Sequence, residues 1–142
     1  MTLYDPSLEP LPPFDTPTDS TNPKDLLGAK KPPMWLIPQS AMVILSRVMA
    51  LGAAKYGPYN WRKKKVRATV YVSAAQRHLA TWLDGETNDE ESTVSHLAHV
   101  MACCAIVLDA QATGNLVDDR PEPGATSRLI KELTHNDQAD PR

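Results

Sequence analysis

Residues 76–104 read QRHLATWLDGETNDEESTVSHLAHVMACC and contain three of the chain's four histidines. They indicate the end of one helix, a short acidic loop and the start of a second helix. His96 and His99 are three residues apart on the second helix, so they share one face. The loop carries four carboxylates, those of Glu86, Asp89, Glu90 and Glu91. Oxygen ligands beside imidazoles predict a site for a divalent metal ion.

The same residues also have a simpler explanation, in which the carboxylates cap helix ends and the two histidines are buried in the core. His78, one turn before Trp82, is by itself more often a core histidine than a ligand, and Arg77 is equally ambiguous. If a metal binds, oxygen ligands favour Mg²⁺ or Mn²⁺, whereas imidazoles shift the preference toward Mn²⁺ or Zn²⁺. The residues alone leave these alternatives open.

Apolar periodicity predicts two helices before the acidic loop. The first begins at Pro38, a residue suited to the first helical position, and ends at Gly57. The second covers residues 68–83, with Asp84-Gly85 as its stop. Each helix is expected to bury one face. The apolar residues are Met42, Leu45, Val48, Met49 and Ala53 in the first helix, and Val70, Ala74, Ala75, Leu79, Trp82 and Leu83 in the second.

The most regular apolar pattern follows the acidic loop. It predicts a third helix that is capped by Ser92 or Thr93 and continues to about Ala112, before Gly114. A short fourth helix fits SRLIKELTH, residues 127–135, and no alternating apolar run indicates a strand. The predicted fold class is all-α, a small helical bundle of three main helices plus a short C-terminal helix, with a proline-rich N-terminal arm.

Composition divides the chain into four parts. Nine of the thirteen prolines precede residue 39, and residues 1–21 are predicted to be a disordered tail because they are poor in apolar side chains. Residues 22–37 carry more apolar side chains and are predicted to form an extended arm that docks on a neighbouring surface. Residues 38–121 are the predicted helical catalytic domain. Residues 122–142 are expected to form the short helix and a fraying tail.

Charge and hydropathy limit the possible partners. The 142 residues suffice for one domain, and 15 Lys and Arg against 17 Asp and Glu give a net charge of −2, so no global field attracts nucleic acid or membrane. No run approaches the roughly 18 apolar residues of a membrane span, and the acidic N-terminus does not resemble a signal peptide. We therefore expect a cytoplasmic protein with reduced Cys103 and Cys104. Cys103, Ile106 and Val107 lie off the main apolar stripe of the third helix, which predicts a homo-oligomer.

Residues 55–67, KYGPYNWRKKKVR, combine aromatic rings with a run of cations. Five of the six residues from Arg62 to Arg67 are basic, and Tyr56, Tyr59 and Trp61 precede them closely. A solvated basic loop is one explanation. Rings beside cations also suit a ligand that joins a nucleobase to phosphates, because the base can stack while the phosphates pair with the cations. The residues leave both interpretations open.

A series of short motifs gives the chain a family resemblance. The motifs are NPKD (22–25), GAKK (28–31), GAAKYGPYNWR (52–62), RHLATWLDGE (77–86), DEES (89–92), HLAHVMACCAIVLDA (96–110) and GNLVDDRP (114–121). Over roughly residues 22–121 the chain resembles the phage dATP/dGTP diphosphohydrolases, small all-α enzymes related to the MazG-like nucleotide pyrophosphatases. The resemblance implies metal-dependent hydrolysis of the purine deoxynucleoside triphosphates dGTP and dATP to the monophosphate and pyrophosphate. It also implies a place in the purine metabolism of phages that replace adenine by 2-aminoadenine.

The resemblance implies roles for the residues named above. Glu86 and Asp89 match an acidic pair of the wider pattern and are expected to bind Mg²⁺ or Mn²⁺, with His96 and His99 as further ligands or as supporting groups. Glu91 is expected to orient or deprotonate the attacking water. The expected substrate contacts are Lys55, Arg62 and Arg77 for the phosphates, Tyr56, Asn60 and Trp61 for the base, and His78 beside them.

A protein of another class would fit the same composition. A non-catalytic helical module could bind nucleic acid or a protein partner through the basic run from Arg62 to Arg67. Acidic residues beside histidines would not help to bind the negatively charged backbone of nucleic acid. The sequence therefore favours the enzyme, and nucleic acid is not an expected partner.

Overall fold

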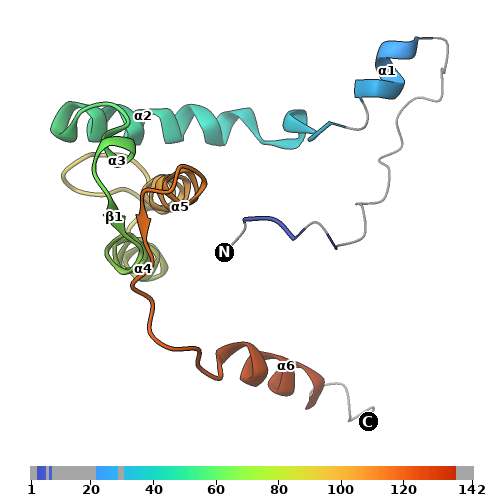
Figure 1. Ribbon diagram of the computed structural model, residues 1–142. Coiled ribbons are helices and arrows are strands. Elements are labelled where there is room, and N and C mark those ends of the chain that lie inside the picture. The colour runs from blue at the N-terminus through green and yellow to red at the C-terminus, as the bar shows by residue number, and fades with distance from the viewer. Residues whose placement is uncertain (1–2, 6, 8–21, 29–30, 137–142) are drawn as a thin grey trace.

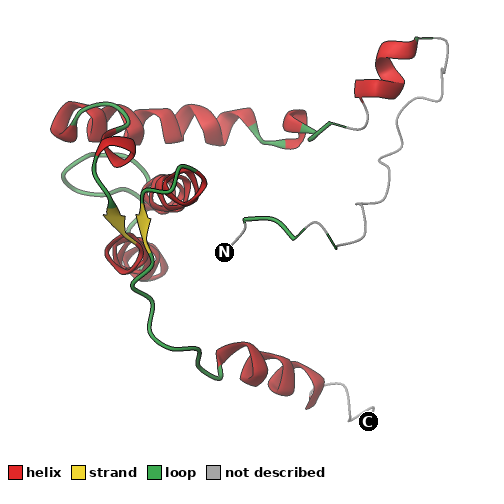
Figure 2. Ribbon diagram, viewed as in Figure 1, coloured by secondary structure: helices red, strands yellow, loops and turns green. Residues whose placement is uncertain are grey.

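The structure is a computed structural model that describes residues 3–5, 7, 22–28 and 31–136. These residues are mainly helical, with one very short pair of strands (Figure 2). The elements in chain order are α1 (Pro23–Gly28), the 3₁₀ turn η1 (Met34–Leu36), α2 (Gln39–Tyr56), α3 (Asn60–Lys63), β1 (Val66–Arg67), α4 (Ala68–Leu83), α5 (His96–Ala112), β2 (Leu116–Val117) and α6 (Thr126–Asn136). This architecture confirms the all-α prediction, with α2, α4 and α5 as the three main helices.

The core lies where α5 is packed between α4 and α2, and α2 crosses over it (Figure 1). Leu45 and Val48 of α2 lie in one buried cluster with Ala98 and Ala102 of α5. The small alanine side chains allow the two helix backbones to approach each other closely. Partly buried residues pack around this cluster, namely Met49, Val94 and Met101.

Some residues of the predicted apolar faces are exposed instead of buried. Leu83 and Val70 of α4 are exposed. Among the described residues α4 packs mainly against α5, so the side of α4 that faces away from α5 is left uncovered. Met42 of α2 is exposed for the corresponding reason, since α2 has its main contact with α5. The other exposed members of the predicted faces are Leu79 and Trp82.

The predicted limits hold for both ends of α2 and α4 and for the end of α5 at Ala112. α2 has Pro38 as its N-cap and Gly57, with a φ of 87°, as its C-cap, and α4 covers residues 68–83 as predicted. The predicted start of α5 is wrong. Ser95 is its N-cap, and its hydroxyl accepts a hydrogen bond from the backbone N–H of Leu97. Residues 92 and 93 instead belong to a turn, in which the N–H of Thr93 donates to the carbonyl of Asp89.

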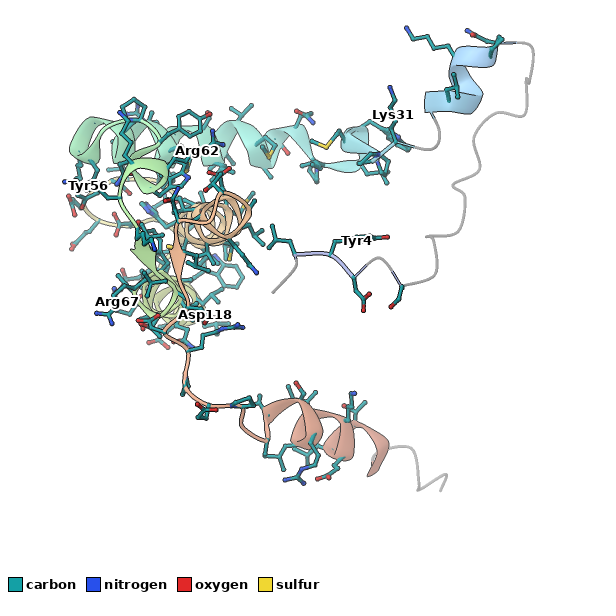
Figure 3. All side chains as sticks on the ribbon, viewed as in Figure 1. Tyr4, Lys31, Tyr56, Arg62, Arg67 and Asp118 are labelled. Carbon is teal, nitrogen blue, oxygen red and sulfur yellow. The ribbon has the colours of Figure 1, made fainter. Side chains whose placement is uncertain are left out.

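A short parallel strand pair, which the sequence did not indicate, joins distant segments. Val66 in β1 lies opposite Leu116 in β2, and each strand has only two residues, too few for an alternating pattern. Asp119, just after β2, accepts hydrogen bonds from the backbone N–H and the hydroxyl of Thr69 and also pairs with Arg67. These contacts cap the start of α4 with a carboxylate from the other end of the domain. Figure 3 shows Arg67 and Asp118 on either side of this junction.

The two flanking segments extend away from the three long helices (Figure 1). The arm predicted to be extended, residues 22–37, contains α1 and η1, and Trp35 within it is 73% exposed. At the other end, α6 exposes Leu129, Ile130 and Leu133. The tail predicted for residues 1–21 lies outside the described residues apart from 3–5 and 7.

None of the helices in the described parts of the chain combines the length and the apolar character that crossing a membrane would need.

Candidate metal centre and substrate segment

The hairpin of α4 and α5 brings residues from three places together. His78 lies five residues before the end of α4, His96 is the first residue of α5, and Asp89 lies in the loop between the helices. The loop folds back on itself, because Asn88 and Ser95 form an antiparallel bridge. The N–H of His96 also donates to the carbonyl of Thr87 at 3.1 Å. These backbone contacts hold the loop, and Asp89 with it, against the start of α5.

Three imidazoles are packed against one another in this hairpin. The Nδ1 atoms of His78 and His96 are 2.8 Å apart, and the ring of His78 is stacked on that of His99 with a centroid separation of 4.5 Å. Nε2 of His99 is 2.8 Å from the hydroxyl oxygen of Ser92 and 4.0 Å from a carboxylate oxygen of Asp89. His96 is only 4% exposed, and its Nε2 is buried without a hydrogen-bond partner in the described structure.

The surroundings favour the neutral forms of His78 and His99 and the ionised form of Asp89. Burial lowers the pKa of His78, and the neighbouring His99 and His96 lower it further. Burial is also the main reason why the pKa of His99 is lowered. Hydrogen bonds from Ser92 hold the pKa of Asp89 below its ordinary value, because they stabilise the charged form. Neutral histidine and ionised aspartate are the protonation states that bind metal ions.

The donor atoms of His78, Asp89 and His96 fit a metal ion. Each residue offers one ligand atom, and the three atoms lie within 4.8 Å of one another. One of the three, His96, also has a buried Nε2 without a hydrogen-bond partner among the described residues. Two imidazoles and one carboxylate suit Mn²⁺, Fe²⁺ or Zn²⁺ better than Mg²⁺, which prefers oxygen ligands. The arrangement is therefore a candidate metal centre.

The group of three differs in its members from the predicted ligand set, which stays a prediction. Asp89 and His96 come together as predicted, whereas the side chain of Glu86 is exposed and lies outside the group of three. His99 lies beside the group and contacts Ser92. His78 takes part instead, although the sequence favoured a core role for it. The sequence did contain a signal for the position of His78, because residues shortly before a hairpin loop face those shortly after it.

An ion pair connects the acidic loop to the end of α2. Nζ of Lys55 is 2.5 Å from a carboxylate oxygen of Glu91, and both side chains are largely exposed. The hydrogen bond and the charge of Glu91 raise the pKa of Lys55. Lys55 was predicted to contact phosphate and Glu91 to act on water, and here the two residues neutralise each other.

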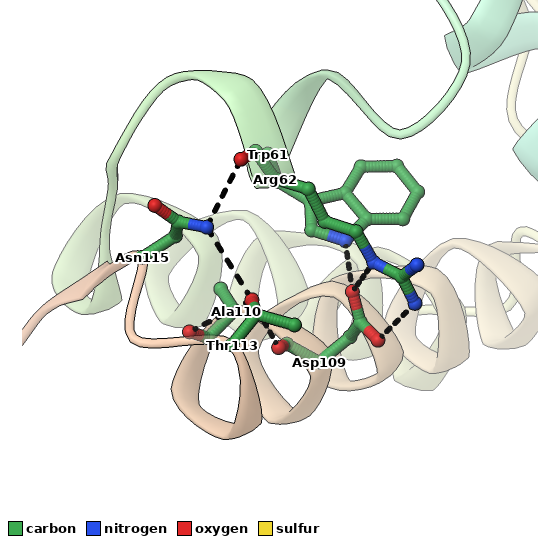
Figure 4. Close-up of polar contacts among 6 residues, drawn as sticks. All are labelled: Trp61, Arg62, Asp109, Ala110, Thr113 and Asn115. Carbon is green, nitrogen blue, oxygen red and sulfur yellow. Dashed lines mark hydrogen bonds and ion pairs between the residues drawn. The ribbon is translucent and has the colours of Figure 1, made fainter.

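The aromatic and basic segment is anchored on the far end of α5 (Figure 4). The indole N–H of Trp61 donates to the carboxylate of Asp109 at 2.6 Å, and the guanidinium of Arg62 donates to both of its oxygens at 2.7 Å. These donors lower the pKa of Asp109 to about 2, with Arg62 as the largest cause. The guanidinium of Arg62 also lies 4.5 Å from the centre of the Tyr59 ring.

The predicted substrate residues differ in their accessibility. Trp61 is 8% exposed, whereas Tyr59 is 55% exposed and Tyr56 is exposed at the end of α2. Asn60 is half-buried and Arg77 is exposed. Beside them, an apolar groove is lined by Met42, Leu45, Met49, Pro58, Tyr59 and Trp61. The predicted substrate contacts of all these residues stay predictions.

The metal centre and the anchored segment lie at opposite ends of α5. Asp109 follows His96 by 13 residues on the same helix, so roughly 20 Å of helix separates them. Lys55 is connected to both regions. It lies in the last turn of α2, just before the aromatic segment, and it pairs with Glu91 of the acidic loop.

Comparison with known proteins supports the resemblance that the motifs indicated over residues 22–121. No curated protein and no solved structure matches the chain. Residues 21–120, which include both the candidate metal centre and the aromatic segment, match a family model described as dATP/dGTP diphosphohydrolase, N-terminal. The chain therefore belongs to the dATP/dGTP diphosphohydrolase family through this N-terminal domain.

Proposed function

We propose that this protein is a metal-dependent hydrolase that converts dGTP and dATP to the nucleoside monophosphate and pyrophosphate. The observation that carries the proposal is the group of His78, Asp89 and His96, which can hold a metal ion within a domain of a family named for dATP and dGTP hydrolysis. The reaction breaks the bond between the α-phosphorus and the oxygen that bridges to the β-phosphate. Water adds its oxygen to the α-phosphorus, and pyrophosphate leaves with the electron pair.

His78, Asp89 and His96 would hold the ion, and we favour Mn²⁺ over Mg²⁺ because two of the three ligands are imidazoles. A divalent ion bound there would offset phosphate charge and lower the pKa of a bound water. His99 and Ser92 would keep the neighbouring groups oriented, since His99 is stacked on His78 and Ser92 donates to Asp89. Glu86 is exposed in the same loop and would provide a further oxygen ligand.

The pair of Lys55 and Glu91 supplies a proton acceptor when substrate binds. The triphosphate carries more negative charge than one carboxylate, so it competes with Glu91 for the ammonium group of Lys55. Glu91 is then free to accept the proton from the attacking water. Both side chains are exposed and lie next to the loop that carries Asp89, which supports this exchange.

The base is proposed to lie on the exposed rings of Tyr56 and Tyr59, with Asn60 at its edge. Stacking alone discriminates weakly among bases because each base has a π-face. An amide offers both a donor and an acceptor, so Asn60 is the proposed source of purine preference. Arg77, exposed one residue before His78, is proposed to contact phosphate.

We also propose that the protein is a homo-oligomer. Val43 and Ile44 of α2 and Leu108 of α5 are exposed, although both helices contribute other residues to the core. A second copy would remove this apolar surface from water. Light scattering at micromolar concentration is expected to give a dimer or a tetramer, and a monomer would contradict the proposal.

Hydrolysis can be tested with one substitution and a matched control. Wild-type protein is incubated with dGTP, dATP and dCTP, with Mn²⁺, with Mg²⁺ or with EDTA, and the products are separated by chromatography. We expect dGMP, dAMP and pyrophosphate, with no products in EDTA. Asp89→Asn is expected to lower turnover by about 100-fold or more, because it removes a charged ligand.

The matched control is Glu90→Gln, which removes a carboxylate from an exposed neighbour in the same loop. It is expected to retain wild-type turnover. Full activity of Asp89→Asn, or equal loss in both variants, would remove the metal site from this group of residues. Circular dichroism checks that both variants keep the helical content of the wild type.

A further inference from the structure

Asp109 uses its whole carboxylate to hold α3. One oxygen accepts from the indole N–H of Trp61 and from Nε of Arg62, and the other accepts from Nη2 of Arg62. The side-chain amide of Asn115 also donates to the backbone carbonyl of Arg62 at 3.0 Å. Figure 4 shows these contacts reaching α3 from the end of α5 and the turn after it.

The segment needs such an anchor because its own backbone does not fix its position. α3 has only four residues, and its N-cap residue makes no side-chain hydrogen bond. A single helical turn is not stable by itself in water. The approach to α3 passes through left-handed backbone at Tyr59, with a φ of 53°, which also requires support from the surroundings.

The anchor reaches the exposed ring of Tyr59 through Arg62. The guanidinium of Arg62 is held by Asp109 on one side and lies against the Tyr59 ring on the other. The Trp61 ring, buried under the same segment, is 5.4 Å from the Tyr59 ring between centroids. The guanidinium of Arg62 therefore links the Asp109 anchor to the exposed ring of Tyr59.

We propose that Asp109 is a positioning residue for nucleobase recognition, because it holds Trp61 and Arg62 so that Tyr59 and Asn60 keep the orientation that receives the base. This role rests on the proposed function. It is distinct from the metal centre, whose His96 lies roughly 20 Å from Asp109 along α5. Loss of the anchor therefore weakens substrate binding and leaves the chemical step intact.

Asp109→Asn tests the proposal because it keeps the shape of the side chain and removes its charge. We expect KM for dGTP and dATP to rise about tenfold, since a charge-assisted contact is lost, while kcat stays within about twofold. The Mn²⁺ concentration that gives half-maximal activity is expected to stay unchanged. A fall in kcat at unchanged KM would overturn the proposal.

The matched control is Asp119→Asn, which removes a carboxylate that caps α4 through Thr69 and Arg67. It is expected to lower Tm and to leave KM within about twofold of the wild-type value. If Asp119→Asn and Asp109→Asn raise KM equally, Asp109 acts only through stability and the proposal is wrong.

Trp61→Phe provides a second route if Asp109→Asn does not fold. It keeps an aromatic ring in the buried site and deletes only the N–H that donates to Asp109. We expect a rise of about threefold in KM at unchanged kcat. Adding Trp61→Phe to Asp109→Asn is expected to raise KM by less than Trp61→Phe does alone, because both substitutions break the same hydrogen bond. Unchanged KM in Trp61→Phe, together with normal wild-type turnover, overturns this inference alone. Absence of wild-type turnover and of dGTP binding overturns the proposed function and this inference together.

Discussion

The two ends of α5 carry polar clusters that differ in how far their bonding capacity is used. At the start of the helix, His96 is buried and its Nε2 has no partner in the described structure. At the far end, both oxygens of Asp109 are occupied by donors from Trp61 and Arg62. Burial of an unsatisfied donor or acceptor costs free energy, so it is retained where a ligand supplies the partner. A saturated cluster, in which the acceptor oxygens are already paired as at Asp109, instead holds the neighbouring residues in place.

The largest expected effect tests the unsaturated end. His96→Asn removes a ligand from the candidate metal centre, and turnover is expected to fall by about 100-fold or more. Isothermal titration of Mn²⁺ should show clearly weaker binding than in the wild type. His135→Asn serves as the control, because His135 lies outside the residues matched by the family. Unchanged Mn²⁺ affinity in His96→Asn would mean that the orphaned nitrogen does not mark a metal site.

A smaller effect concerns the saturated end and acid stability. The pKa of Asp109 is about 2 in the folded protein, below its value in an unfolded chain. Its contribution to the free energy of unfolding is therefore fully present above about pH 4 and is lost as pH falls toward about 2. In denaturant titrations over this interval, Asp109→Asn should lose less stability on acidification than the wild type.

Asp118 allows a control for that measurement. It pairs with Arg120, which is exposed and only two residues away in the chain. Asp118→Asn is expected to change the acid dependence less than Asp109→Asn, because exposed local pairs contribute little. Equal effects of the two substitutions would show that the anchor of α3 is no stronger than a surface pair.

The sequence predicted the features that depend on local patterns. The limits of α2 and α4 followed from Pro38, Gly57 and the apolar spacing, and the acidic hairpin with its histidines was placed correctly. The start of α5 was missed because Ser92, Thr93 and Ser95 are all good caps, and only the turn closed by Asp89 decides among them.

The remaining features depend on contacts between distant residues. Trp61 and Asp109 are 48 positions apart, and a single carboxylate near the end of an apolar helix gives no sign of such a partner. The stacking of Trp61 on a base stays a prediction. In the structure, Trp61 also helps to hold α3 through its hydrogen bond to Asp109. The pairing of β1 with β2 is equally non-local, and strands of two residues leave no pattern to find.

The cap that Asp119 provides for α4 has a consequence for the order of events during protein synthesis. Thr69 and Asp119 are 50 positions apart, whereas the facing His78 and His96 are separated by only 18. At about 5–20 residues per second, the ribosome adds the 20 residues from His99 to Asp119 in roughly 1–4 s. The imidazole cluster can therefore assemble about that long before the start of α4 receives its cap. Until then, the first N–H groups of α4 must be satisfied by water.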